Sequence, residues 1–246
     1  MAILIPFILS TLAGLSTLLG IIFIYIKASS EKIIKYSLAF SAGVMICMSM
    51  IDLIPESINL LNESMIKNIS YLYLLLAILL GMLLPFIIDK ILNKNENELY
   101  RVGVLSLLAI IAHNIPEGIA TYLSAQINIK LGFKMAIAIA LHNIPEGISI
   151  IIPLYYGSKN KRKAIIMTIM SALSEPLGAL LAFLFLKPII TNKIMGIILG
   201  MIAGIMSYIS VIELLPESLE YKEKKKTIAF FMIGIIFMYI SINLMK

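Results

Sequence analysis

The sequence predicts an all-α integral membrane protein with eight transmembrane helices. Hydrophobic residues make up 60% of its 246 residues and charged residues only 14%, whereas the apolar share of soluble domains is about 45–50%. The apolar residues form eight runs of roughly 20 residues, the length that crosses a bilayer as a helix. The runs lack the alternation of barrel strands, and open strands would leave backbone groups unpaired in lipid. We therefore expect one transmembrane domain over residues 1–246.

The first three predicted spans cover residues 3–26, 34–54 and 71–91. The first span has no basic segment before it, is longer than the core of a signal peptide and lacks a clear cleavage site, so we expect a retained helix. The second span carries Ala-Gly-Val-Met from Ala42, with Asp52 and then Pro-Glu-Ser from Pro55 around its end. The third span is identified by its apolar length.

The next three predicted spans cover residues 102–123, 133–155 and 164–186. The fourth span contains His-Asn-Ile-Pro-Glu-Gly from His113, and the fifth repeats this motif from His142. The sixth span contains Ser-Glu-Pro-Leu-Gly, which includes Glu175. A proline inside a helix displaces the carbonyl four residues earlier, and in both repeats this carbonyl lies next to the histidine. The prolines are compatible with simple kinks and with positioning of the histidines.

The last two predicted spans cover residues 194–215 and 227–244. The seventh span matches the second, because Ala-Gly-Ile-Met begins at Ala203, Glu213 takes the place of Asp52, and Pro-Glu-Ser begins at Pro216. The eighth span is identified by its apolar length. The match indicates an internal repeat, and the alternative is chance recurrence of the small residues that favour helix contacts in membranes.

Basic residues between the spans predict the orientation. With the amino terminus outside, fourteen of the twenty Lys and Arg residues fall on the cytoplasmic side, as the positive-inside rule requires. This topology accounts for the net charge of +6 without nucleic acid as a partner. We expect a multi-pass protein of the cell membrane, with the lipid bilayer around it and both termini outside. The single cysteine, Cys47, has no partner for an intrachain disulfide.

The same topology makes the second and seventh spans antiparallel, and also the fourth and fifth. The simplest architecture is a 3+2+3 arrangement in which the first and last triplets form an inverted repeat about an axis in the membrane plane. Many secondary transporters use this plan and bind their substrates near the midplane.

The repeated motif contains both histidines of the chain. Helical spacing brings the histidine, asparagine and glutamate of each copy to one point of its helix. These residues are His113, Asn114 and Glu117 in the first copy and His142, Asn143 and Glu146 in the second. Glu175 is a third intramembrane carboxylate, and insertion scales put each such charge at a cost of about 2.5–3.5 kcal/mol. A divalent cation would offset this cost, so we predict a metal site. The alternative is an imidazole bonded to a neighbouring helix.

The ligand types narrow the choice of metal. Imidazole suits zinc and other late divalent ions, and carboxylate also accepts iron and manganese. The candidate ligand set contains no thiolate that would favour copper(I). The candidate ligands exceed the four of a structural zinc site, and the surplus is enough to form two adjacent sites, which suits an ion that must leave again; the ligand types leave open whether one or two ions bind. The metal is then a bound substrate, and we expect no further cofactor. Because the ligands must lose protons to bind metal, affinity should fall as the pH drops towards the histidine range.

Transport of a divalent cation is the function that these features favour, and we do not expect an enzyme. An intramembrane metalloenzyme is the alternative, but the helix of a zinc protease pairs two histidines as His-Glu-x-x-His, and each motif here contains one. The ligand set leaves import and export open.

The paired motifs, Ser-Glu-Pro-Leu-Gly on the following span and eight spans with outside termini resemble the ZIP family (Zrt/Irt-like, zinc–iron permease), in particular its short prokaryotic branch. The resemblance covers the whole chain and implies uptake of zinc, iron, manganese or cadmium into the cytoplasm, a binuclear centre between the fourth, fifth and sixth helices, and frequently a homodimer. The positions that match the family's transport site are His113, Asn114, Glu117, His142, Asn143, Glu146 and Glu175, with Met45 as an accessory residue that faces the site.

Two equivalent acidic residues of the internal repeat suggest a pathway for the ion. Asp52 lies towards the outside and Glu213 towards the inside in the predicted topology, which fits an entrance and an exit. The alternative is that both are interfacial carboxylates. We expect Glu56 and Glu217, further along each helix, to lie in solvated ends.

Overall fold

A computed structural model describes residues 4–92, 97–186 and 191–245 of the chain. In these residues all regular secondary structure is helical, and eight helical segments are long and apolar enough to cross a membrane. The prediction of an all-α chain with eight spans is therefore confirmed. The spans are Leu4–Tyr25, Ser30–Ser64, Lys67–Ile91, Glu98–Ile127, Ile129–Ser158, Lys161–Phe185, Asn192–Leu219 and Lys224–Leu244.

Several spans contain more than one helical element. The elements are α1 (Leu4–Leu15), η1 (Ser16–Tyr25), α2 (Ser30–Met48), η2 (Ser49–Leu53), α3 (Ile54–Ser64), α4 (Lys67–Ile91), α5 (Glu98–Ile127), α6 (Ile129–Ser158), α7 (Lys161–Ala172), α8 (Ser174–Leu181), η3 (Ala182–Leu186), α9 (Asn192–Tyr208), η4 (Ile209–Leu214), α10 (Leu215–Leu219) and α11 (Lys224–Met245).

The helices are longer than most of the apolar windows that predicted them. The second helical segment runs through Pro55 to Ser64, ten residues beyond the predicted end at residue 54. This extension, α3, is amphipathic and packs against α9 and α4. An apolar window reports only the part of a helix that suits lipid, whereas tertiary contacts stabilise the polar turns at its ends.

The two copies of the internal repeat share an unusual backbone geometry. The helix widens to π-type hydrogen bonding at η2, just before Pro55, and at η4, just before Pro216. Proline lacks the N–H group that would complete the ordinary helical ladder, so a widened turn ahead of it has a direct local cause. The widened turns contain Asp52 and Glu213, respectively.

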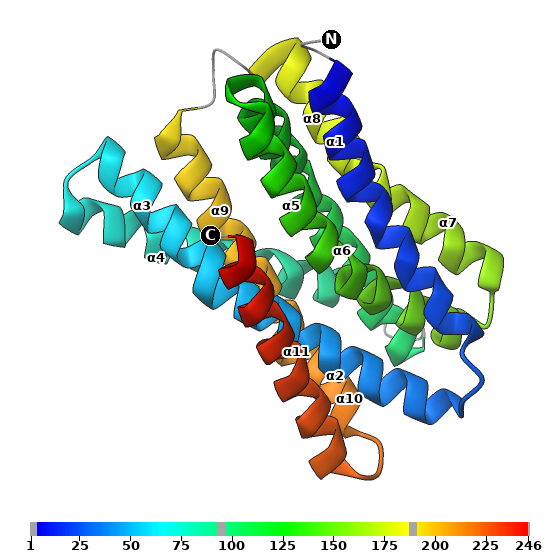
Figure 1. Cartoon of the computed structure of the whole chain (residues 1–246). Coiled ribbons are helices and arrows are strands. Elements are labelled where there is room, and N and C mark those ends of the chain that lie inside the picture. The colour runs from blue at the N-terminus through cyan, green and yellow to red at the C-terminus, as the bar shows by residue number, and fades with distance from the viewer. Residues whose placement is uncertain (1–3, 93–96, 187–190, 246) are drawn as a thin grey trace.

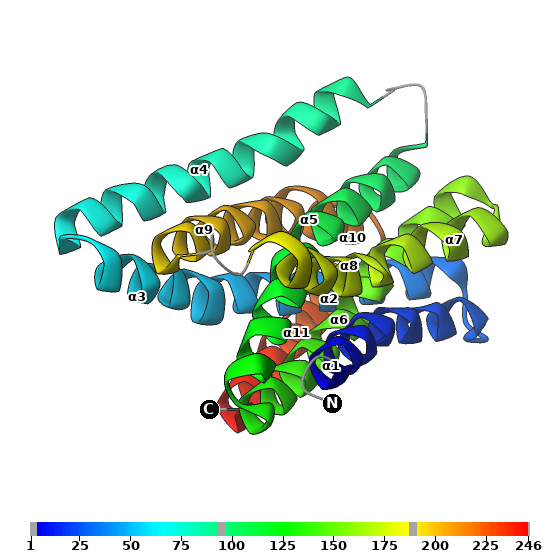
Figure 2. The same cartoon turned by 90° about the horizontal axis from the view of Figure 1, so that it is seen from above.

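Helices α5 and α6 lie at the centre of the bundle. In their most apolar windows, 72% of the residues around α5 and 67% of those around α6 are buried, against 22% for α4 and 22% for α11. Figure 1 shows α5 and α6 between α1 and α7 on one flank and the crossing pair α2 and α11 on the other. Seen from above in Figure 2, α4 forms one edge, with α9 and α3 beside it.

Close helix contacts recur at equivalent positions of the repeat. Gly43 on α2 lies against the backbone of Phe231 on α11, and Gly204 on α9 lies against the backbone of Ile78 on α4. A Cβ atom at either glycine would overlap a carbonyl oxygen, so only glycine permits this approach. The two contacts are consistent with a two-fold relation between the outer triplets, and the 3+2+3 arrangement stays a prediction.

A cluster of charged side chains ties the start of α2 to the turn before α11. Lys35 is only 2% exposed, and its ammonium donates hydrogen bonds to the carboxylates of Glu31 at 3.3 Å and Glu223 at 3.1 Å. A third bond goes to a backbone carbonyl of the turn at 3.1 Å. Hydrogen bonds from Lys226, Tyr36 and Lys35 lower the pKa of Glu223 to about 2.

Replacing Lys35 with methionine should lower the thermal midpoint of unfolding by a few degrees, because three hydrogen bonds are lost. Lys32→Met, at an exposed position one residue after Glu31, is the matched control and should leave the midpoint unchanged. The contribution of Glu223 should be fully present above its ordinary pKa of 4.5 and be lost as the pH falls through about 2. Scanning calorimetry at pH 7 measures the midpoints of Lys35→Met and Lys32→Met. Equal midpoints for the two variants would contradict the predicted role of Lys35.

Candidate metal centre

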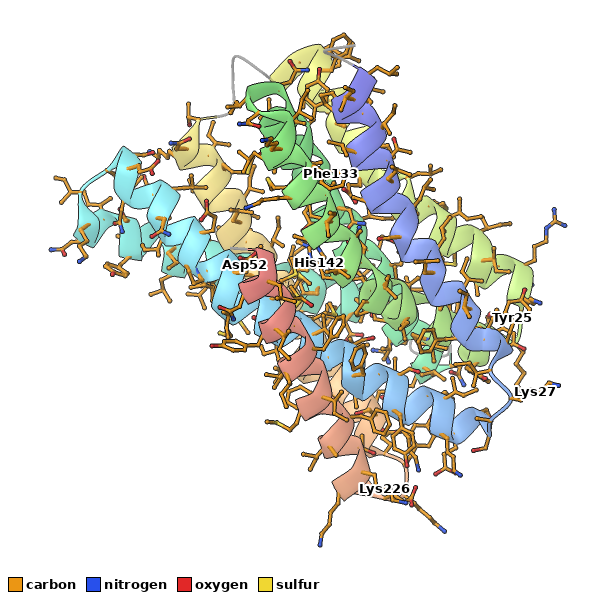
Figure 3. The ribbon with its side chains drawn as sticks, viewed as in Figure 1. Tyr25, Lys27, Asp52, Phe133, His142 and Lys226 are labelled. Carbon is orange, nitrogen blue, oxygen red and sulfur yellow. The ribbon has the colours of Figure 1, made fainter. Side chains whose placement is uncertain are left out.

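The α5–α6 hairpin brings the two histidine motifs together. Asn128 ends α5 in an extended conformation, and its side chain accepts a hydrogen bond from the backbone N–H of Lys130 at the start of α6. This cap supplies a partner for an N–H group that the helix leaves free, so the chain reverses in a single residue. The two helices then pack against each other, and Figure 3 shows His142 in the middle of the molecule.

Glu117 joins the two histidines. Its Oε1 atom lies 2.9 Å from Nε2 of His142 and 3.1 Å from Nε2 of His113. Nε2 of His113 also lies 3.5 Å from Oε1 of Glu146. Three possible ligand atoms lie within 4.8 Å of one another, and they belong to His113, His142 and Glu146. This spacing suits a single divalent cation, because metal–nitrogen and metal–oxygen bonds to zinc are about 2.0–2.2 Å.

A second polar group adjoins the first and includes α8. The side-chain amide of Asn143 donates to Oε2 of Glu175 at 2.9 Å and to the carbonyl of Ala13 on α1 at 3.0 Å. Ser10 on α1 donates to the backbone carbonyl of Glu175 at 3.2 Å. Asn143 follows His142 directly, so the two groups share α6 and lie next to each other. The first helix therefore holds both polar residues of the second group in place.

Glycine allows α8 to approach α5 closely enough to deliver Glu175. A Cβ atom on Gly118 would overlap the backbone carbonyl of Glu175, and one on Gly178 would overlap the carbonyl of Ile115. The sixth span breaks at Leu173, just before α8 begins. Pro176 explains the break, because it offers no N–H group to the carbonyl of residue 172.

The seven predicted ligand residues are all buried, with exposed fractions from 0% to 7%. Many of their polar atoms have no hydrogen-bond partner in the described structure. These atoms are Nδ1 of His113, Nδ2 and Oδ1 of Asn114, Oε2 of Glu117, Oδ1 of Asn143, Oε2 of Glu146, and Oε1 of Glu175. A buried polar atom without a partner costs about 1–3 kcal/mol. Such a concentration of unpaired oxygen and nitrogen atoms is expected where a cation supplies the missing interactions.

The accessory residues occupy different places. Met45 is fully buried on α2, one turn after Ser41, whose hydroxyl donates to the carbonyl of Pro145 on α6. Asp52 is half-buried and acts electrostatically on His113, and Figure 3 draws it in the middle of the view. Glu213 is also half-buried.

The surroundings of Glu213 include a second set of charges. It interacts electrostatically with Asp89 at the end of α4 and with Arg101 near the start of α5, and these two form an ion pair with each other. Glu56 is exposed, as predicted. The prediction of a solvated Glu217 is wrong, because this side chain is only 7% exposed. The short helix α10 packs on α2 and turns Glu217 inwards.

Ser10 and Ala13 are contributors to the site that the motifs did not reveal. A signal for them exists in the sequence, because small residues recur at helical spacing on one face of the first span: Ser10, Ala13, Gly14 and Thr17, all buried. Such a face indicates close helix packing, but it does not identify the helix that packs there.

The chain matches one family of known proteins over nearly its whole length. The family described as "ZIP Zinc transporter" matches residues 1–98 and 94–242. Similar curated proteins include "Zinc transporter ZupT" of Streptococcus mutans, 39% identical over 97% of this chain and 96% of the relative. The protein of the same name from Chlorobaculum parvum is 37% identical over 99% of this chain and 98% of the relative. That of Lysinibacillus sphaericus is 36% identical over 99% and 98%, respectively.

Proposed function

This multi-pass membrane protein belongs to the ZIP zinc transporter family, and on that premise we propose that it carries zinc and related divalent cations into the cytoplasm through the site between α5, α6 and α8. Iron, manganese and cadmium are further candidate substrates. The metal is cargo in this proposal, without a resident cofactor and without enzymatic turnover. Metal export and intramembrane hydrolysis are the alternatives.

One observation carries the proposal: buried carboxylate, imidazole and amide atoms without partners are concentrated where α5, α6 and α8 meet. Zinc accepts nitrogen and oxygen ligands, and the group around Glu117 offers both types from two helices. The adjoining group of Asn143 and Glu175 supports a second ion position. Two neighbouring positions would let an ion transfer between ligands without losing all of them at once.

The pathway residues and the orientation are part of the same proposal. We propose that Asp52 lies towards the entrance, because it acts on His113 from the widened turn η2. Glu213 lies towards the cytoplasmic exit, and Met45 faces the site from α2. Both termini lie on the extracellular side of the cell membrane, and two copies of the chain form a homodimer. Cysteine labelling of the termini in intact cells and chemical crosslinking in membranes test these two points.

Ion uptake into proteoliposomes of known protein orientation tests the transport function. Zinc, ferrous iron, manganese and cadmium are supplied outside, and a trapped indicator reports their entry with and without an imposed membrane potential. We expect zinc entry well above that of protein-free vesicles, with orientation deciding the direction. Entry equal to that of protein-free vesicles, with correctly folded protein present, would overturn the proposal.

Zinc binding should weaken as the pH falls from 7.5 to about 5.5. An imidazole binds metal only in its neutral form, and an unperturbed histidine has a pKa of about 6.5. Protons therefore compete with zinc increasingly over this interval, so the dissociation constant should rise by at least about tenfold. Titration calorimetry of the purified protein at both pH values measures the change, and a constant affinity would argue against histidine ligands.

A further inference from the structure

A pocket lies at the ends of three helices, apart from the metal centre. It encloses about 310 Å³ between the start of α2, the start of α5 and the end of α6. This volume is at the lower end of the range for small-molecule sites, roughly 300–1,000 Å³. Its lining consists of Ser30, Ile34, Leu99, Tyr155, Tyr156 and Lys159. Two buried aliphatic side chains thus meet three hydroxyl groups and one ammonium group.

The charge around the pocket is positive. In the part of the chain that the structure describes, the ammonium of Lys159 has no ion-pair or hydrogen-bond partner. The turn after it adds three exposed basic residues, at positions 161–163. Lys163 lies 4.3 Å from the ring centroid of Tyr100, next to the pocket residue Leu99. Figure 3 places Lys27 at the same end of the molecule, away from His142.

Two acidic residues adjoin the lining residues in the sequence. Glu31, next to Ser30, accepts a hydrogen bond from the buried Lys35. Glu98, next to Leu99, interacts electrostatically with Arg101 on the next turn of α5. Within the pocket itself, an anion would find an unpaired ammonium and several hydroxyl donors.

The position of the pocket points to lipid as the source of the anion. Three membrane-length helices begin or end beside it, at Ser30, Glu98 and Ser158. This is the level at which tyrosine rings and lysine side chains meet phospholipid headgroups. Basic pockets between transmembrane helices on the cytoplasmic side are known to bind anionic headgroups.

We propose that this pocket binds the headgroup of an anionic phospholipid. The phosphodiester accepts hydrogen bonds from Lys159, from Ser30 and from the hydroxyl of Tyr156. Ile34 and Leu99 contact the glycerol region, and the acyl chains lie along the exposed apolar surface of the bundle. The assignment rests on the membrane orientation proposed above but on no step of metal transport, so a failure of zinc uptake would leave it standing.

Lys159→Asn is the sharpest variant for a test. Lys159 has a φ of 53°, in the left-handed region, and asparagine adopts this conformation more readily than lysine. The substitution therefore removes the charge without straining the backbone. Lys193→Asn is the matched control, because Lys193 is also an exposed lysine but lies outside the pocket, over the ring of Tyr73. Tyr156→Phe is a second pocket variant that removes only a hydroxyl.

The experiment measures the thermal midpoint of the full chain in detergent with phosphatidylglycerol, phosphatidylcholine or inorganic phosphate added. For the wild type and Lys193→Asn we expect phosphatidylglycerol to raise the midpoint by about 3 °C more than phosphatidylcholine does. Lys159→Asn should lose at least half of this difference, and Tyr156→Phe should lose part of it. An undiminished difference in both pocket variants would overturn the proposal. Equal shifts from inorganic phosphate and phosphatidylglycerol would also overturn it, because the site would then be one for a soluble anion.

Discussion

Glu117→Ala should reduce zinc uptake by at least about 100-fold while the protein still inserts and folds. Glu117 is the residue that contacts both histidines, at 2.9 Å and 3.1 Å, so its loss removes one ligand of the proposed site and also leaves two imidazoles without their shared partner. Substitutions of groups that merely support metal ligands already cost about 10–100-fold in affinity or activity. Loss of a ligand should cost more.

Two further variants separate the chemical role of Glu117 from its size. Glu117→Gln keeps the volume and removes the charge, and we expect it to be nearly as inactive as the alanine variant. Glu63→Gln makes the same change at an exposed position, where the carboxylate accepts a hydrogen bond from Asn192, and should transport normally. Uptake is measured in proteoliposomes with equal amounts of each protein. Retained uptake in Glu117→Gln would show that this carboxylate fills space and does not bind the ion.

Gly118→Ala should destabilise the bundle and remove most of the zinc uptake. The added Cβ atom would overlap the backbone carbonyl of Glu175, so α5 and α8 must separate and carry Glu175 away from Asn143. Overpacking of this kind costs about 1–3 kcal/mol. It outweighs the roughly 1 kcal/mol by which alanine is the better residue within a helix. We therefore expect a lower thermal midpoint together with lost uptake.

Gly200→Ala is the control for Gly118→Ala. Its Cβ atom would meet side-chain atoms, at 3.0 Å from Cβ of Ala77 and 3.1 Å from Oγ of Ser57, and no backbone carbonyl is among its nearest neighbours. A helix displacement of a few tenths of an ångström relieves such contacts, so this variant should come much closer to the wild-type midpoint and uptake than Gly118→Ala does. If Gly118→Ala behaves in the same way, the close approach of α8 is not required for the site.

Short-range patterns were sufficient to predict the helical class and the eight spans, and the ligand set that they indicate stays a prediction. The bilayer requires helices of known length, so eight apolar windows predicted eight spans. Helical periodicity brings residues three and four apart to one face, so the motif from His113 predicted a convergent group. The structure places Glu117 and Glu146 against the histidines, and Glu175 in the adjoining group.

Long-range contacts decided the remaining features. Ala13 supplies a carbonyl to Asn143 across 130 positions of the chain, and the sequence of neither segment identifies the other as its partner. Glu217 was wrongly expected in solvent, because the sequence near the end of a span does not show which helix packs on it. The packing of α10 on α2 buries this side chain. Asp52 and Glu213 are equivalent in the repeat, yet one acts on a histidine and the other lies beside Arg101.

The sequence by itself therefore determined the helical class, the number of spans and the residues able to bind metal, because these depend on helix geometry and on the thickness of the bilayer. Only the tertiary structure decided which helices touch, that α1 supports Asn143 and Glu175, and that glycine contacts bring α8 to the site. The physical reason is that lipid-facing and protein-facing apolar side chains are equally hydrophobic. In a membrane, composition alone does not distinguish the two faces, and close packing and hydrogen bonds between helices select the partners.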